Sequence, residues 1–335
     1  MKELTRNWII TGIIFSVCIL FTVFCGLGIA HMRKDDVVPT NESSSEAPAS
    51  SEKTPVSSSA LPESDDAVSS AEPTDPALPS SDENRSTGTI RALSDEEIKV
   101  IQERYSDVPQ YYSIAGERDS ENRSVAAVNY HSTFSLKFKR VYVFNPQTRS
   151  DVSLCFILTH EYGYTNAVLD ILKENNIKAT FFVDWSYMDN NSEIIERILL
   201  EKHELASLGA SNPSDGIGLY GMTDVMNDLI NLNNIAESIY DRPLTKLYFN
   251  HDSFRDQTVV LATQMGYEVI FYSAYYEDDD PSKSIDASAY LQSLQLQAHK
   301  GAIYRLHTAN AAVVQVLPAF LSFLGSNGYT VGLID

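Results

Sequence analysis

The C-terminal part of the chain predicts an α/β fold in which parallel strands alternate with helices, as an open sheet or a barrel. Three segments lead to this class: an apolar run at residues 152–158, apolar residues at helical spacing at 165–175, and a second apolar run at 179–183. Strand, helix and strand in this order make one βαβ unit. The chain repeats the alternation to its end, so we expect functional loops at the carboxyl ends of the strands.

The first residues predict a membrane anchor. Residues 8–30 contain no charged side chain, and these 23 residues are about the length with which a helix crosses a bilayer. Residues 1–34 are therefore expected to form a single transmembrane helix with its flanks. A cleaved signal peptide is the alternative, because Gly28 and Ala30 are small residues at a suitable offset. The apolar stretch is longer than is usual for such a peptide, which favours the anchor.

Residues 35–92 predict a disordered linker. The segment is rich in Ser, Pro, Asp and Glu and has few large apolar residues, so it cannot bury enough surface to fold. Half of the chain's formal net charge of −20 lies in residues 35–89, which carry 12 acidic and two basic residues. This balance argues against nucleic acid as a partner. A tether placed after an anchor would hold the following domain away from the membrane.

Residues 93–150 are expected to form a lead-in to the main domain. Ser94 and Glu97 have the spacing of a capping box ahead of apolar residues, so a helix is predicted at 93–105. After it, the runs at 124–128, 134–139 and 141–144 alternate or are rich in aromatic residues. They suggest a few strands.

The main domain, residues 151–335, continues the alternation after the first βαβ unit. Helices are predicted at 192–202, 223–240, 256–265, 287–298 and 312–324, and strands at 203–208, 246–249, 268–273, 302–307 and 330–334. The three cysteines are Cys18, Cys25 and Cys155, two in the predicted anchor and one in a predicted buried strand. They provide neither a disulfide framework nor a cysteine metal site.

Residues 152–335 resemble the polysaccharide deacetylase (NodB-homology) family, in particular its peptidoglycan-deacetylase branch. Phe156, Glu161, Gly163 and the Ala-Thr-Phe-Phe-Val run at 179–183 are in register with its first motif, and 301–308, Gly-Ala-Ile-Tyr-Arg-Leu-His-Thr, with its last. The resemblance implies an irregular (β/α)7-type barrel. With the predicted anchor, it implies a single-pass protein of the cell membrane whose C-terminal domain is extracytoplasmic.

Members of this family remove the acetyl group of an N-acetyl sugar with a divalent metal, an Asp base and a His acid. The resemblance places Ile157 at the base position and three other residues at the metal-ligand positions: Leu158, Leu208 and Asn212. Aliphatic side chains have no lone pair, and an amide is a weak substitute for an imidazole. Tyr248 stands where the family has the Arg that orients the base. The family's metal set is therefore replaced, and no cofactor is expected.

Other family positions are retained. By resemblance, His307 would be the general acid and Leu306 would line the acetyl pocket, while Asp278 keeps an Asp of the fourth motif. Aromatic and polar residues after other strands are further candidates for substrate binding, because aromatic rings can stack on sugars: Tyr248, His251 and Tyr272.

Three functions remain open. The first is a membrane-tethered deacetylase-like protein that has lost the metal-dependent reaction and binds cell-wall glycan or an envelope partner. The second is an active N-deacetylase of peptidoglycan or chitooligosaccharide with a rebuilt site, in which His160, His251 and His307 would bind Zn²⁺. The third is an envelope scaffold with no sugar ligand.

Overall fold

The computed structural model describes residues 89–146 and 150–334. The predicted anchor and nearly all of the predicted linker lie outside these residues. Within them, none of the helices combines the length and the apolar character that crossing a bilayer requires.

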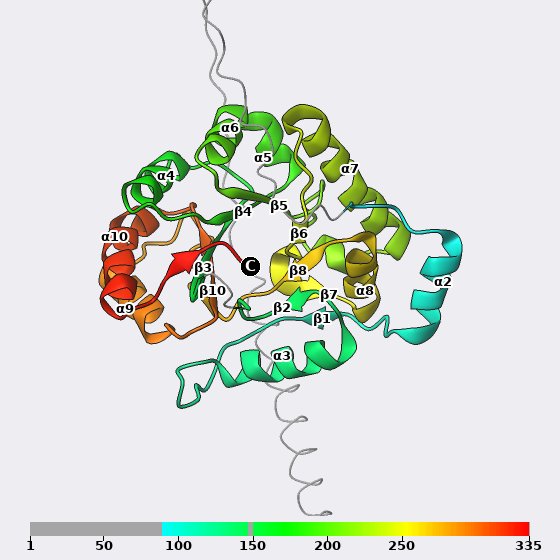
Figure 1. Cartoon of the computed structure of the whole chain (residues 1–335), viewed down its shortest axis with the longest axis horizontal. Coiled ribbons are helices and arrows are strands. Elements are labelled where there is room, and N and C mark those ends of the chain that lie inside the picture. The colour runs from blue at the N-terminus through cyan, green and yellow to red at the C-terminus, as the bar shows by residue number, and fades with distance from the viewer. Residues whose placement is uncertain (1–88, 147–149, 335) are drawn as a thin grey trace, which may run out of the picture. The chain divides into compact units, whose positions relative to one another are not determined.

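The structure confirms the alternation predicted from the sequence (Figure 1). The helices of the main domain are α4 (Thr165–Glu174), α5 (Trp185–Asn190), α6 (Ser192–Leu200), α7 (Met222–Tyr240), α8 (Asp256–Met265), α9 (Ala287–Leu296) and α10 (Ala311–Ser326). The strands are β3 (Val152–Leu158), β4 (Thr180–Val183), β5 (Glu204–Ser207), β6 (Lys246–Leu247), β7 (Ser253–Phe254), β8 (Glu268–Ile270), β9 (Ala274–Tyr275), β10 (Ala302–His307) and β11 (Val331–Gly332). Short 3₁₀ turns lie at η1 (Ile217–Leu219) and η2 (Asn250–Asp252).

The main sheet is parallel, in the order β2-β8-β6-β5-β4-β3-β10-β9, where β2 is Val141–Tyr142, with β11 beside the start of β3. One short segment joins the two sides of this sheet. β8 pairs with β6 on one side, and β9, which begins four residues after β8 ends, pairs with β10 on the other. The sheet thus curls into a barrel with the helices outside it (Figure 1). This agrees with the barrel expected from the resemblance.

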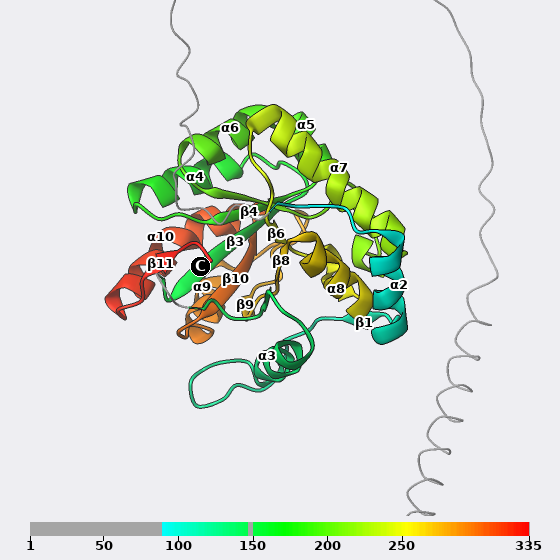
Figure 2. The same cartoon turned by 45° about the vertical axis from the view of Figure 1, so that its right-hand side comes forward.

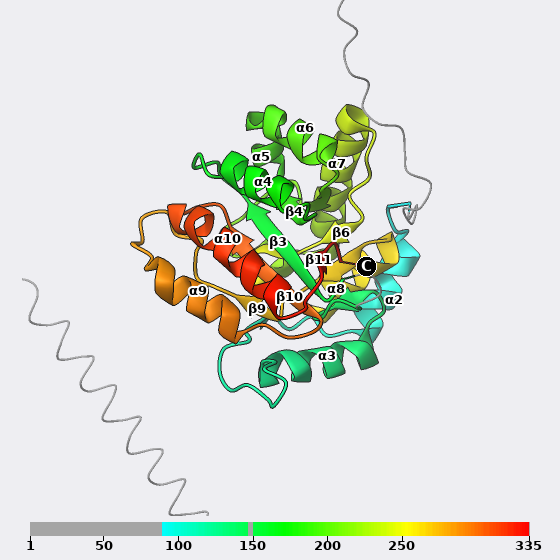
Figure 3. The ribbon, with the colours of Figure 1, turned by 60° about the vertical axis from the view of Figure 1, so that its left-hand side comes forward.

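Alternate residues of the central strands face two different clusters. On β3, Leu154, Phe156 and Leu158 pack against the surrounding helices, whereas Cys155 and Ile157 face the barrel interior. The alternation follows from the two-residue period of a strand. On the outer side, α9 and α10 pack beside each other (Figure 3). Both faces of the sheet are covered, which explains the nearly continuous apolar run of β3.

The lead-in begins as predicted, with α2 (Asp95–Arg104). Ser94 and Glu97 form the capping box, and Ile98 and Ile101 are buried. Just before α2, the amide of Arg91 donates to the carbonyl of Met265 at 3.0 Å, at the end of α8. The chain therefore enters the domain at the amino ends of the strands, opposite to the rim where the strands finish.

The strands expected at 124–128 and 134–139 are wrong, because α3 (Val125–Lys137) occupies both segments. Ser124 caps this helix by accepting a hydrogen bond from the amide of Ala127. The helix packs Phe134 among aromatic rings of the lead-in and barrel, and it lies apart from α4 and α6 (Figure 2). The strand expected at 141–144 is confirmed in part by β2 (Val141–Tyr142), and β1 (Gln110–Tyr111) pairs with β7.

A buried histidine before β5 should make the fold sensitive to acid. His203 is 1% exposed and its Nδ1 accepts the amide of Ala179 at 3.1 Å, so the ring is neutral. Burial lowers its pKa to about 4. The unfolded chain takes up a proton at the ordinary pKa of about 6.5, but the folded chain does not. The free energy of unfolding should therefore fall by about 2–3 kcal/mol between pH 6.5 and pH 4.

Urea unfolding at several pH values would measure this effect. A His203→Gln variant should show a flatter pH dependence over the same range, because it lacks the buried imidazole. Equal pH dependence in the two proteins would contradict the assignment to His203.

Candidate functional site at the carboxyl ends of the strands

The rim of the barrel collects polar residues from several strands. Parallel strands finish at the same end of a barrel, so residues that follow them meet there. His160 follows β3, Asp184 follows β4, Asn212 follows β5, and His307 ends β10.

His307 and Asp278 form a hydrogen-bonded pair on the rim. The ring Nδ1 of His307 lies 2.8 Å from Oδ1 of Asp278, and its backbone amide donates to Oδ2 at 2.9 Å. Asp278 is fully buried, and the hydroxyl of Tyr290 donates to its Oδ2 at 2.6 Å. Because a carboxylate accepts, Nδ1 carries the proton, and Nε2 bonds no residue that the structure describes. This geometry orients the imidazole as a proton donor or acceptor needs to be.

Glu161 has a structural role. Its Oε1 accepts the amide of Gly163 at 2.6 Å, and its Oε2 accepts the hydroxyls of Thr165 at 2.5 Å and Tyr187 at 2.6 Å. Burial, and secondarily Glu161, raise the pKa of the Tyr187 hydroxyl. Both carboxylate oxygens are occupied in fixing the start of α4, so Glu161 is not free to bind a ligand.

Asp184 is a rim carboxylate that the sequence analysis did not single out. It is 2% exposed, and its Oδ1 caps α5 by accepting the amide of Tyr187 at 2.8 Å. Burial raises its pKa, while His160 and the side-chain amide of Asn212 act in the opposite direction. Asn212 in turn accepts a hydrogen bond from Asn250 at 2.7 Å. The sequence could have indicated Asp184 as a site residue, because it is an acidic residue directly after the apolar run at 179–183.

The barrel interior holds a charged and aromatic cluster centred on Arg305. Its Nη1 donates to Oδ2 of Asp252 at 2.7 Å and lies 3.3 and 3.2 Å from the hydroxyls of Tyr248 and Tyr272. The same hydroxyls donate to Asp252, each at 2.8 Å. The guanidinium also lies 4.4 Å above the ring of Tyr272. We call these four residues the Arg305 cluster.

The Arg305 cluster leaves little space inside the barrel. The cavity beside it, which Cys155 and Ile157 also line, has a volume of about 10 Å³, which is about that of one water. Next to the cluster, His251 and Asp252 have backbone φ angles of 61° and 56°. Two successive left-handed residues other than glycine persist only where their surroundings hold them. The ion pair and the tyrosine hydroxyls provide that support for Asp252.

Comparison with known proteins gives the family. Residues 148–270 match the family model of polysaccharide deacetylase. The chain carries a polysaccharide deacetylase domain. A similar protein, the peptidoglycan-N-acetylmuramic acid deacetylase PdaA of Bacillus subtilis, is 26% identical over 205 residues, 59% of this chain and 75% of that protein.

Solved structures agree on the fold of the deacetylase domain. The structure of Bacillus subtilis PdaA, a family 4 carbohydrate esterase, has a TM-score of 0.63 at 22% identity and covers 69% of this chain and 97% of its own. BA3943, a family 4 pseudoenzyme from Bacillus anthracis, has a TM-score of 0.53 at 20% identity, with coverages of 71% and 92%.

Of the four residues that the resemblance places at the base and ligand positions, three lie in apolar clusters of the deacetylase domain. Ile157 and Leu208 lie in the interior cluster, 4% and 1% exposed. Leu158 is fully buried and faces the helices. Asn212 is exposed and bonded to Asn250. These four positions therefore supply no base and no converging set of metal ligands.

The alternative zinc set is not brought together either. Within residues 89–146 and 150–334, no three His, Cys, Asp or Glu side chains converge as a metal site requires. His160, His251 and His307 thus stand apart as ligands in this arrangement. His160 is exposed, and its Nδ1 is 3.4 Å from the hydroxyl of Thr159.

The predicted substrate-binding residues of the deacetylase domain differ in accessibility. Leu306 is fully buried between the sheet and the helices, so it presents no surface to a ligand. Tyr248 and Tyr272 are 3% and 4% exposed, and their hydroxyls are used within the Arg305 cluster. His251 is exposed on the rim and His307 is partly exposed. Of these residues, the two histidines alone are open to a ligand.

Proposed function

We propose that this protein binds cell-wall glycan from the outer side of the membrane and does not carry out metal-dependent deacetylation. One observation carries the proposal: the base position and two ligand positions are aliphatic and buried in apolar clusters. Hydrolysis of an acetamide in this family needs a metal-bound water and a base, and Ile157, Leu158 and Leu208 can hold neither. The similarity to peptidoglycan deacetylases supports a cell-wall glycan as the ligand class.

The location is part of the same proposal. A single anchor in residues 1–34, followed by an acidic tether, would keep the domain at the membrane while it reaches the wall. Such a protein would need to bind glycan but would not need to catalyse a reaction on it.

Acetate release tests the loss of the reaction. We expect the full chain, supplied with Zn²⁺, Co²⁺ or Mn²⁺, to release no more acetate from peptidoglycan or chitooligosaccharide than a His307→Ala variant does. The variant is a suitable control because His307 is the one rim residue at a retained acid position. Release by the wild-type chain well above the variant would overturn the proposal.

Sedimentation with purified peptidoglycan sacculi tests the binding. Retention of the chain on sacculi is expected. A chain that is not retained would favour the third function, an envelope scaffold without a sugar ligand.

The His307–Asp278 pair favours a second candidate, an active N-deacetylase with a rebuilt site. The pair has the geometry of a general acid, with Nε2 free to approach a leaving amine. This candidate would require Zn²⁺ held through His160, His251 and His307, and thus a rearrangement of the rim. About one tightly bound zinc per full chain, lost in a His251→Ala variant, would favour it.

A further inference from the structure

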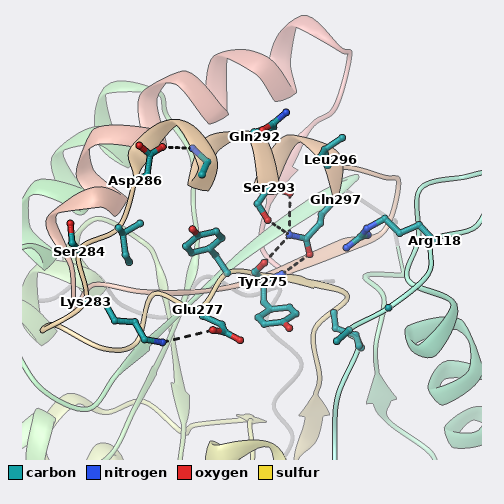
Figure 4. A pocket seen from close by; sticks show the side chains of 16 residues that line it. Arg118, Tyr275, Glu277, Lys283, Ser284, Asp286, Gln292, Ser293, Leu296 and Gln297 are labelled. Atoms are coloured by element: carbon teal, nitrogen blue, oxygen red, sulfur yellow. Dashed lines mark hydrogen bonds and ion pairs between the residues drawn. The ribbon is translucent and has the colours of Figure 1, made fainter.

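A groove lies outside the barrel mouth, between α9 and the segment of residues 114–118 that precedes α3. Its volume is about 910 Å³, within the range of small-ligand sites. In Figure 4, Tyr275 lies below Ser293 and Gln297, and Arg118 lies to the right of Gln297. The groove is formed by residues outside the segment 148–270 that matches the family model.

One wall is a face of α9. Four residues at helical spacing line it, two of them small and one an amide: Ala289, Gln292, Ser293 and Leu296. The spacing of three and four residues places them on one side of the helix. Small side chains keep the groove wide, and the exposed Gln292 offers both a donor and an acceptor to a ligand.

The ring of Tyr275 packs against Tyr272, with 5.4 Å between the ring centroids, and its centroid lies 5.1 Å from the guanidinium of Arg305. The backbone of Tyr275 is also held. The backbone amide of Tyr275 donates to Oε1 of Gln297 at 3.1 Å, and its carbonyl accepts from Nε2 of Gln297 at 2.8 Å. Gln297 is 5% exposed, and its Nε2 is further bound to Ser293 at 3.1 Å. The hydroxyl of Tyr275 bonds no residue that the structure describes, and its ring is half-buried. A fixed aromatic ring with a free hydroxyl is suited to a pyranose, which has an apolar face and polar edges.

Arg118 gives the opposite wall a positive charge. Its Nη1 donates to the carbonyl of Asn122 at 2.9 Å, and no carboxylate of the described residues forms an ion pair with it. The other charged residues of the groove are engaged. Asp286 caps α9 by accepting the amide of Ala289 at 2.7 Å, and Lys283 lies 3.8 Å from Glu277.

This charge matters because the chain as a whole carries −20. An anionic ligand is repelled by such a protein unless a local cation attracts it. Arg118 matches a carboxylate, to which a guanidinium binds with two parallel hydrogen bonds.

We propose that this groove binds a cell-wall saccharide that carries a carboxylate, with a sugar ring on Tyr275 and the carboxylate on Arg118. The inference rests on the proposed function and names the ligand class for it. It places the glycan site between α9 and the lead-in, where Tyr275 borders the filled barrel interior.

Two disaccharides that differ in one substituent test whether the groove prefers a carboxylate. Chitobiose is neutral, whereas N-acetylglucosaminyl-N-acetylmuramic acid carries a lactyl carboxylate. By calorimetry with the full chain, we expect the second to bind at least about tenfold more tightly. A third probe is the same disaccharide with an L-Ala-D-Glu stem, in which the lactyl carboxylate has become an amide and the D-Glu carries two carboxylates. Its affinity relative to the second shows whether Arg118 prefers a sugar or a peptide carboxylate.

Substitutions in the groove test whether the disaccharide binds there. Arg118→Gln should remove the preference for the carboxylate, whereas Arg104→Gln, an exposed arginine of α2, should keep it. Ala289→Trp should fill the groove and abolish binding of all the probes, and Ser288→Trp, its exposed neighbour on α9 that does not line the groove, should not. Gln292→Trp, at an exposed position, serves as a second block if Ala289→Trp folds poorly.

Unchanged binding in both groove-filling variants, or a carboxylate preference that survives Arg118→Gln, would overturn the assignment of this groove. Failure of the wild-type chain to bind any disaccharide would do the same. Sedimentation with sacculi separates this failure from that of the proposed function. Retention of wild type and groove-filling variants alike leaves glycan binding standing elsewhere on the domain, whereas a wild-type chain that is not retained removes both proposals.

Discussion

Replacement of Leu158 with aspartate should destabilise the protein by about 5 kcal/mol or more, although aspartate is a residue that the family uses at this position. Leu158 is fully buried on the side of β3 that faces the helices, beside Val183 of β4. A carboxylate there has neither water nor a cation as a partner. Leu158→Ala should lose about 3 kcal/mol through packing alone, so the excess in the aspartate variant measures the buried polar group.

Ile157→Asp introduces the same carboxylate at the neighbouring residue, and its loss of stability is compared with that of Leu158→Asp. Ile157 faces the interior and lines the same small cavity as Arg305, whose buried Nε has no hydrogen-bond partner among the described residues. A carboxylate at 157 can approach this guanidinium, so we expect a loss about 2 kcal/mol smaller than for Leu158→Asp. Urea unfolding of the three variants gives the values. Equal losses for Asp at 157 and 158 would contradict the orientation of β3.

The second large effect is expected at the Arg305 cluster. Asp252→Asn should lower the free energy of unfolding by about 3 kcal/mol, because it leaves a buried guanidinium without its counter-charge. Side chains of Arg305 and Asp252 are 13% and 20% exposed, so solvent screens the pair only in part. Asparagine tolerates the left-handed backbone of residue 252, so the change isolates the charge.

A double variant decides whether the ion pair is the cause. Arg305→Leu introduces the residue that the resembled motif has at this position. Combined with Asp252→Asn, it should recover at least about 2 kcal/mol relative to Asp252→Asn alone, because no unpaired charge remains. Strictly additive losses in a double-mutant cycle would show that the two side chains stabilise the fold independently.

Local periodicity was sufficient for most of the main domain. The helix at 256–265 and the strand at 302–307 were predicted with the bounds that α8 and β10 have, because their apolar patterns are regular and turn residues limit them. The lead-in was harder. Val125–Lys137 contains Val, Tyr, Thr and Phe, which favour strands, and only two of its residues are buried. The helix depends on the packing of Phe134 against distant rings, and no local pattern reveals that.

The site was less accessible to prediction than the fold. Motif spacing led to the prediction that Ile157, Leu158 and Leu208 occupy the family's base and ligand positions, and the structure shows that all three side chains are buried. The pairing of Arg305 with Asp252 could not be predicted in this way, because 53 positions separate them and the partnership arises when the sheet curls. The groove at Tyr275 likewise combines the lead-in with α9, which lie far apart in sequence.

The point at which the chain enters the domain determines which end of the barrel a tether would occupy. Thr89 and Arg91 lie against Met265 and Gly266, below the amino ends of the strands, while His307 ends a strand at the other end. If the preceding residues fasten the protein to a bilayer, as we propose, the tether joins the domain at the end opposite the histidine-bearing rim. A tether attached there leaves the rim uncovered, whichever way the domain turns on its linker.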